Sequence, residues 1–454
     1  MKQNNVNATM LKALLFKELR ELAATRSFWA MLLVLCPLVG FSFMEAVLLY
    51  GHAGESILGD DILMARLSPL EGIVVPTFSA LYLSEVFLFP FVIIRILGVE
   101  KQFGSMKLLL QICPRIGIVL LVKGAVAMIA FFLSLIPALC ALLIWHLLGG
   151  YLYLPEVANL LLGHVLFALF VIAIAFFAVS VTDSPQTAAI VTLSFTISSW
   201  VLEFAGQNQS SLNGISWLSV TKHLRLFETG LFSLQTVFGF LLASVFFTQL
   251  SAIWLKTHND NFSKFKKSGL TFPIFSIAAL LVSQVFYFKD FSENRINSFN
   301  PKNEAELRKI TKPLKITIHL GPDDSLSVDF EQNFLSKLRR VVKDVTVIYV
   351  PPKEAGAGGQ EDPKFGQILY DYNGIQLQSH DVGAPRALET LHVLTGVSLE
   401  GEVASPYPGH PLKTETGICH FVFYVFLPAV ILLSWLTSQR LMRKSKGVVI
   451  FAKE

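Results

Sequence analysis

The stretch ANLLLGHVLFALFVIAIAFFAVSV, residues 158–181, contains no Asp, Glu, Lys or Arg. A helix of this length can cross the hydrocarbon core of a bilayer, which takes about 20 apolar residues. Seven other runs in the chain are apolar over about 18 residues or more. We therefore expect a polytopic α-helical membrane protein with eight spans near residues 28–50, 73–97, 116–148, 158–181, 187–205, 231–255, 270–288 and 418–436.

The composition favours the same fold class. Hydrophobic residues make up 53% of the 454 residues and charged residues only 15%. A soluble domain of this length could not remove that much apolar surface from water. The net charge of +4 gives no indication of a nucleic-acid partner. The four cysteines lack the spacing of a zinc or redox site and are expected to be small apolar fillers: Cys36, Cys113, Cys140 and Cys419.

Lys and Arg flank the predicted spans asymmetrically, which predicts the orientation of the chain. With an even number of spans, four basic groups fall on one face, and both termini are expected in the cytoplasm. Only Arg66, Lys222 and Arg225 lie in the short loops of the opposite face. The basic groups are Lys12, Lys17, Arg20 and Arg26; Lys101, Lys107 and Arg115; Lys256, Lys264, Lys266 and Lys267; and Arg440, Arg443, Lys444 and Lys446.

The predicted domain organisation follows from these spans. Leucines at helical spacing in residues 1–27 indicate an amphipathic helix on the cytoplasmic membrane surface, with Lys17, Glu18 and Glu21 on its polar face. The predicted parts are this helix (1–27), a six-span core (28–255), a basic cytoplasmic loop (256–269), a seventh span (270–288), an outer-side domain (289–417), an eighth span (418–436) and a basic cytoplasmic tail (437–454).

Residues 289–417 have the pattern of a small α/β domain. Strand-like LKITIHLG precedes a helix with Phe330, Phe334, Leu338 and Val341 on one face, and a second strand follows. Asn373-Gly374 between alternating segments is a strong hairpin signal, and a closing helix ends near Gly396. The hairpin and the loop of residues 351–363 are the candidate contact surfaces of this domain, because binding residues concentrate on loops of rigid scaffolds.

No catalytic or metal site is expected. The chain has no P-loop, no H-E-x-x-H and no G-x-S-x-G, and the histidines His146 and His164 have no acidic or Cys partner at ligand spacing. Glu45 and Glu203 lie towards the outer ends of predicted spans, whereas Glu85 lies near the middle of the second span, and charged groups inside spans are costly in lipid. Glu85 could line a polar path or accept a proton, or it could bond to Ser or Thr across a helix interface or meet a symmetry mate in a dimer.

The link GVEKQFGSMKLLLQICP, residues 98–114, joins the second and third spans on the predicted cytoplasmic side. Gly104 permits a sharp turn and Ser105 can N-cap a short helix that Pro114 ends. The pattern Glu100, Gly104, Ser105, Leu108, Leu109, Pro114 resembles the segment E-x-x-x-G-T-x-x-x-L-L-x-x-P of type-2 ATP-binding-cassette (ABC) transporter permeases. In that family this segment forms a coupling helix that touches the ATPase subunit.

The resemblance extends beyond this motif. LFKELRELAATRSFW, with Lys17, Glu18, Arg20 and Arg26, is similar to the connecting helix of the family, and residues 217–234 are similar to its outer-side helices. SENRINSF and EAELRKITKPLKITIHL resemble the start of the outer-side auxiliary domain of gliding-motility-type ABC transporters, in which a helix before the KPLKIT stretch leads into an α/β domain.

The resemblance implies a permease subunit of an exporter in a bacterial cytoplasmic (inner) membrane. It further implies a separate ATPase subunit that binds the ATP, no cofactor of the chain's own, and a dimer with itself or a related permease. Glu100 is expected to pair with the ATPase or with the connecting helix near Arg20 or Arg26. The alternative is a non-transporting membrane scaffold that displays the outer-side domain; an intramembrane enzyme has no residues to support it.

Overall fold

The computed structural model describes residues 2–56, 68–112, 115–208, 219–256, 260–293, 295–321, 324–351, 364–399 and 417–451. The chain forms two compact units. Unit 1 comprises Met1–Ser198, Ser233–Tyr287 and Tyr407–Glu454, and unit 2 comprises Ser199–Phe232 and Phe288–Pro406. Among the features predicted from the sequence, Cys113, Pro114, Arg66 and most of the loop 351–363 lie outside the described residues.

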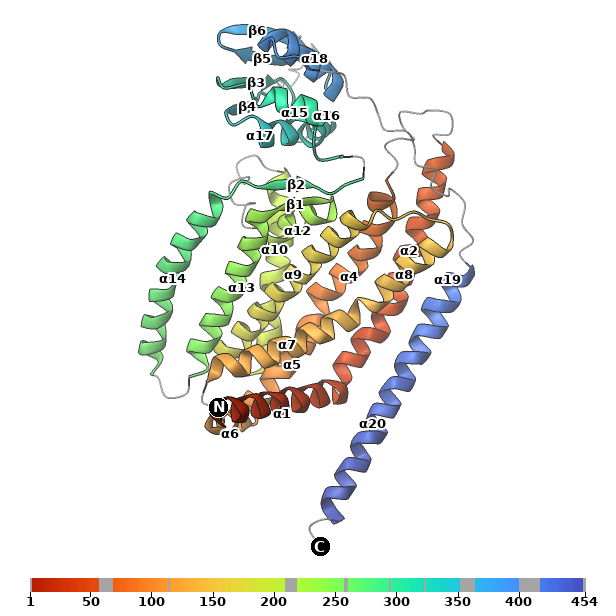
Figure 1. Ribbon diagram of the computed structural model, residues 1–454, viewed down its shortest axis with the longest axis vertical. Coiled ribbons are helices and arrows are strands. Elements are labelled where there is room, and N and C mark those ends of the chain that lie inside the picture. The colour runs from red at the N-terminus through yellow and green to blue at the C-terminus, as the bar shows by residue number, and fades with distance from the viewer. Residues whose placement is uncertain are drawn as a thin grey trace, which may run out of the picture. The chain divides into compact units, whose positions relative to one another are not determined.

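Unit 1 is a bundle of apolar helices (Figure 1). Seven helices among the described residues are long and apolar enough to cross a membrane, so the chain is a helical multi-pass membrane protein. They are α2 (Arg26–Ser56); η1, α4 and α5 (Leu70–Val74, Val75–Phe87 and Phe89–Gln102); α7 and α8 (Ile116–Ser134 and Ile136–Leu147); α9 (Leu154–Val181); α13 (Leu234–Trp254); α14 (Asn261–Ser283); and α19, η4 and α20 (Gly417–Phe421, Val422–Phe426 and Leu427–Phe451).

Three segments differ from the predicted layout. The run 187–205 is helical, as α10 (Pro185–Asn208), but it is not among those seven, and it buries polar side chains such as Thr192 and Thr196. Helix α14 begins at Asn261, inside the predicted loop 256–269, and α20 continues to Phe451, inside the predicted tail. Apolar length sets only the part of a helix that lipid can cover, whereas the backbone hydrogen bonds can continue beyond it.

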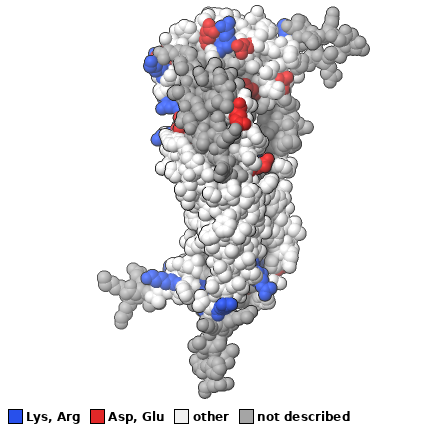
Figure 2. Space-filling view, turned by 90° about the vertical axis from the view of Figure 1, so that its right-hand side faces the viewer, with Lys and Arg blue, Asp and Glu red and all other residues white. Residues whose placement is uncertain are grey.

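Helix α1 (Lys2–Ala24) lies across the ends of the spans, and the short α6 (Ser105–Ile112) lies at the same end of unit 1 (Figure 1). The buried stripe of α1 contains Leu14, Glu18 and Leu22. Glu18 was expected on the polar face; it is only 2% exposed because α1 packs against α7 rather than resting on lipid alone. On the face drawn in Figure 2, Lys and Arg gather at this end of unit 1, next to a broad belt without charged residues.

Unit 2 contains the predicted α/β fold. The order strand, helix, strand, hairpin, helix is confirmed by β3 (Leu314–Ile318), α16, η3 and α17 (Ser325–Phe330, Glu331–Leu335 and Ser336–Val341), β4 (Val345–Tyr349), β5 and β6 (Ile368–Tyr372 and Ile375–Ser379) and α18 (Ala384–Thr395). The sheet order is β4-β3-β5-β6; β3 and β4 are parallel, and the other pairs are antiparallel. Helix α15 (Pro301–Leu307) precedes the sheet, at the place where the resemblance to the gliding-motility-type auxiliary domain implied a helix.

The core of this fold is formed by the residues that the sequence placed on one face. Phe330, Phe334 and Leu338 are fully buried against β3 and α18, and Val341 packs against the same cluster. Asn373 and Gly374 make the β5–β6 turn with φ values of 55° and 83°. Two consecutive positive φ values favour Asn-Gly, which explains the strength of the hairpin signal. Gly396 ends α18 in the left-handed conformation, as predicted.

Unit 2 also includes α12 (Val220–Glu228) and a two-stranded sheet of β1 (Leu231–Ser233), apart from its last residue, and β2 (Phe288–Asp290). Ser219 N-caps α12 by accepting a hydrogen bond from the amide of Lys222 at 3.2 Å. The short sheet joins the segment before α13 to the segment after α14, two stretches that are far apart in the sequence.

Candidate functional site

The predicted coupling segment forms a tight turn and a short helix. After α5 the chain turns at Gly104, whose φ of +72° lies in the left-handed region that favours glycine. The amide of Gly104 donates to the carbonyl of Lys101 at 3.2 Å, and α6 then begins at Ser105 itself. The Ser105 hydroxyl donates to the carbonyl of Glu100 at 3.3 Å. Ser105 therefore secures the turn through a carbonyl, and not by accepting from an amide as the sequence predicted.

The outward face of this segment carries two exposed large apolar side chains beside polar ones such as Lys107. Phe103 is 79% exposed and Leu108 is 63% exposed, whereas Met106 faces inward and is buried. Leu109 is partly buried. Contiguous exposed apolar surface marks interaction sites, so the side chains of Phe103 and Leu108 are the candidates for contact with a partner. On α1, at the same end, Phe16 is 69% exposed.

Behind this face, a buried ion-pair network joins α1, α5 and α7. Lys123 on α7 is fully buried, and its ammonium group lies 2.7 Å from Glu18 Oε2 of α1 and 3.0 Å from Glu100 Oε2 of α5. It also donates to the carbonyl of Ile96 at 2.8 Å. The contact with Glu100 Oε2 is an ion pair without hydrogen-bond geometry. Three helices are thus tied together at the base of the coupling segment.

Lys17 completes the network from the solvent side. It bonds to Glu100, contacts Glu18 at 3.1 Å and lies 3.3 Å from Glu21. Burial on its own would lower the pKa of Lys17, but the hydrogen bond to Glu100 and the charges of Glu18 and Glu100 outweigh it and raise this pKa above its usual value. Lys17 is therefore held in its charged form.

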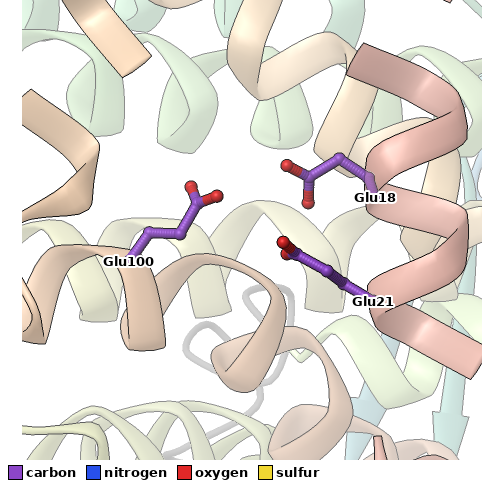
Figure 3. A group of neighbouring side chains, drawn as sticks. All are labelled: Glu18, Glu21 and Glu100. Atoms are coloured by element: carbon purple, nitrogen blue, oxygen red, sulfur yellow. The ribbon is translucent and has the colours of Figure 1, made fainter. Parts of the chain in front are cut away.

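Figure 3 shows the carboxylates of Glu18 and Glu21 on α1 turned toward that of Glu100. Their oxygens lie within 4.8 Å of one another, a spacing that could hold a metal ion. Lys17 contacts all three acids, and Lys123 contacts Glu18 and Glu100. Because these two ammonium groups already supply positive charge to the carboxylates, the group is best described as an ion-pair network.

Sequence reasoning found part of this network. It placed Glu100 against the connecting helix, but near Arg20 or Arg26; the partner is Lys17, and both arginines are exposed on the surface. Lys123 was missed altogether. The available signal was a single Lys inside an otherwise apolar span, since such a residue almost always has a partner in the bundle.

A neighbouring lysine fixes the same segment to α9. The ammonium group of Lys101 donates to the carbonyls of Val179 and Ser180, both at 2.9 Å, and of Thr182 at 2.5 Å. The last carbonyls of a helix have no partner within the helix and attract positive charge. Lys101 therefore caps α9, while the adjacent Glu100 binds α1 and α7.

The intramembrane Glu85 has a partner that none of the sequence alternatives contained. Its carboxylate lies 3.1 Å and 3.3 Å from Nδ1 of His164 on α9, and both side chains are buried. The ring of Phe78 packs on that imidazole at a centroid distance of 5.4 Å. The pair links α4 to α9 inside the bundle. The sequence pointed to each residue separately, but 79 positions separate them along the chain.

A second cluster lies in unit 2, around Asp290 at the end of β2. Its carboxylate accepts hydrogen bonds from the amide and hydroxyl of Ser292 at 2.9 and 2.6 Å, from the amide of Asn297 at 3.0 Å and from the hydroxyl of Ser298 at 2.8 Å. The side chain of Asn297 donates to the carbonyl of Thr229 at 2.6 Å. The cluster therefore joins the end of α12 to the chain that enters the α/β fold.

Arg340 of α17 extends this cluster into the α/β fold. It donates to the carbonyl of Asn297 at 2.7 Å. Burial lowers the pKa of Arg340, and the negative charges of Asp290 and Glu304 oppose that shift.

Gly230 lies against the backbone of Ser292, where an added Cβ would come within 3.1 Å of the Ser292 amide nitrogen. No sequence motif pointed to these contacts.

Comparisons with protein-family models, with curated proteins and with solved structures each found no match.

Proposed function

We propose that this protein is the permease subunit of a type-2 ABC exporter, with ATP hydrolysed by a separate P-loop ATPase. The observation that carries the proposal is the exposure of the apolar side chains of Phe103 and Leu108 on a segment that buried ion pairs connect to the spans. A helix that receives force from a partner needs an apolar surface for contact and a rigid connection to the spans. Both properties occur in the segment that resembles the family's coupling helix.

The connections of this segment give a route for movement. Glu100 and Lys101 are adjacent at the end of α5, and they bond to different helices: Glu100 to α1 and α7, Lys101 to α9. A displacement of α6 therefore acts on α5 through the chain and on three further helices, α1, α7 and α9, through short polar contacts. Such contacts resist separation in an apolar setting, because an unpaired charge there is costly.

Orientation, location and assembly belong to the same proposal. The basic residues near α1 and α6 favour a cytoplasmic position for that end, where an ATPase meets ATP, and the proposed location is a bacterial inner membrane. Unit 2 then carries the α/β domain on the outer side, where it engages the substrate or an outer partner. A dimer with itself or a related permease completes a transporter, as the family resemblance implies.

The test purifies the full chain from its own membrane in mild detergent. The measured quantity is the ATP hydrolysis by the ATPase that co-purifies with the chain. Truncating a central apolar contact costs about 2 kcal/mol or more, so Phe103→Ser with Leu108→Ser should leave less than about a tenth of the bound ATPase. Val393→Ser is the control, since Val393 is 67% exposed on α18 and far from α6 in the sequence.

Equal ATPase recovery with the double variant and with the control would reject α6 as the contact. Absence of any accompanying ATPase from the unchanged protein, with the protein fully inserted, would favour the scaffold.

A further inference from the structure

The last helical segment of unit 1 packs closely on α2. Phe423 of η4 is fully buried, and its ring lies 6.2 Å from the ring of Phe43. It fits over Gly40, where an added Cβ would lie only 2.4 Å from the Phe423 Cβ. Gly40 thus permits a contact between two helices that any larger residue would push apart.

The same segment reaches α1 farther along its length. The hydroxyl of Ser438 donates to the carbonyl of Ala23 at 3.0 Å, and the side-chain amide of Gln439 donates to the carbonyl of Ala24 at 3.3 Å. Ala23 and Ala24 are the last residues of α1. Trp29 of α2 also donates to the carbonyl of Ala23, at 2.8 Å. The final carbonyls of α1, which have no partner within their own helix, are therefore shared between α2 and α20.

We propose that α20 fixes the direction of α1, and that Ser438 and Gln439 are positioning residues for this helix. The ion-pair network holds α1 near Lys17 and Glu18, and α20 holds its C-terminal end. Two separate points of attachment determine the axis of a helix, whereas one leaves it free to pivot. Without α20, the C-terminal end of α1 loses two hydrogen bonds and keeps the one from Trp29 and the chain link to α2, so its direction is less firmly held.

One consequence rests on the proposed function. If α1 is the connecting helix of a permease, then coupling to the ATPase depends on a helix outside the six-span core. Helix α20 also follows the α/β fold of unit 2 along the chain, so it offers a covalent route from that fold to the connecting helix. Loss of the α20 contacts should then change ATP turnover per bound ATPase, with little change in the amount bound.

The experiment measures hydrogen–deuterium exchange of the full chain in lipid nanodiscs. In Ser438→Ala with Gln439→Ala, amides in the last two turns of α1 should exchange about tenfold faster, since two hydrogen bonds at its end are lost. Thr437→Ala is the matched control: this exposed hydroxyl bonds within α20, to the carbonyl of Ser434. Ser438→Thr keeps a hydroxyl and should restore part of the protection. Exchange in α7 should stay unchanged.

Unchanged exchange in α1, with the double variant folded, would overturn the proposal whatever happens to the ATPase. Faster exchange together with unchanged turnover per bound ATPase would retain the attachment and reject its role in coupling. If exchange in α1 becomes faster but no ATPase ever co-purifies with the protein, the attachment of α1 to α20 is supported and the permease assignment is rejected.

Discussion

Replacing Lys123 by Met should destabilise unit 1 by about 3–5 kcal/mol, the usual cost of removing one partner from a buried ion pair. Lys123 is fully buried and holds two carboxylates, Glu18 and Glu100, which otherwise face each other with Lys17 as their remaining cation. The effect should appear as a lower apparent melting temperature of the full chain in detergent. Lys107→Met on the exposed side of α6 is the control and should leave this temperature nearly unchanged.

A second variant separates the loss of charge balance from the loss of packing. Glu18→Met together with Lys123→Met removes one acid and the base at once, and apolar replacements of a whole buried pair are often neutral. The double variant should therefore recover most of the stability that Lys123→Met loses. Equal melting temperatures for Lys123→Met and Lys107→Met would show that the network does not hold α1, α5 and α7 together.

Asp290→Ala should lower the free energy of unfolding of unit 2 by about 4 kcal/mol. Hydrogen bonds to a charged group contribute about 1.5–3 kcal/mol each, and these contributions are not additive. Asp290 accepts bonds from Ser292, Asn297 and Ser298, and through Asn297 it supports the contacts with Thr229 and Arg340. The measurement is hydrogen exchange of residues 290–300 in the full chain, where protection should collapse in the variant.

The matched control for this prediction is Asp324→Ala. Asp324 is an N-cap that accepts one bond, from the amide of Leu326 at 2.9 Å, so its loss should cost only about 1 kcal/mol. Retained protection of residues 290–300 in Asp290→Ala would mean that the sheet of β1 and β2 holds this region without the carboxylate. Asp290→Asn, which keeps one acceptor oxygen, should fall between the two.

Features that depend on local pattern were predictable from the sequence. The length of the apolar runs predicted the helical membrane class. Two of the predicted spans differ in detail: α10 is less apolar than expected, and α14 begins at Asn261, nine residues before the predicted start at 270. Side-chain periodicity and Asn373-Gly374 gave the order of the α/β fold, because alternation and positive-φ turns are properties of neighbouring residues.

Features that depend on tertiary packing were not predictable. Glu18 and Lys123 are 105 positions apart, so nothing local reveals that they meet. Glu18 was assigned to the wrong face because α1 was treated as a helix resting on lipid, although its spacing of four from both Leu14 and Leu22 fits a buried stripe. The strands β1 and β2, three residues each, are too short for a sequence signal.

The central claim is that the face of α6 contacts an ATPase, and cross-linking from that face tests it most directly. A photo-reactive benzoylphenylalanine at position 108, in place of the 63% exposed Leu108, should form a light-dependent adduct in the intact membrane. Mass spectrometry should identify the adduct as a P-loop ATPase, and the same probe at position 393 should not capture it. Adducts only with lipid, or with proteins that bind no nucleotide, from a fully inserted chain would contradict the account.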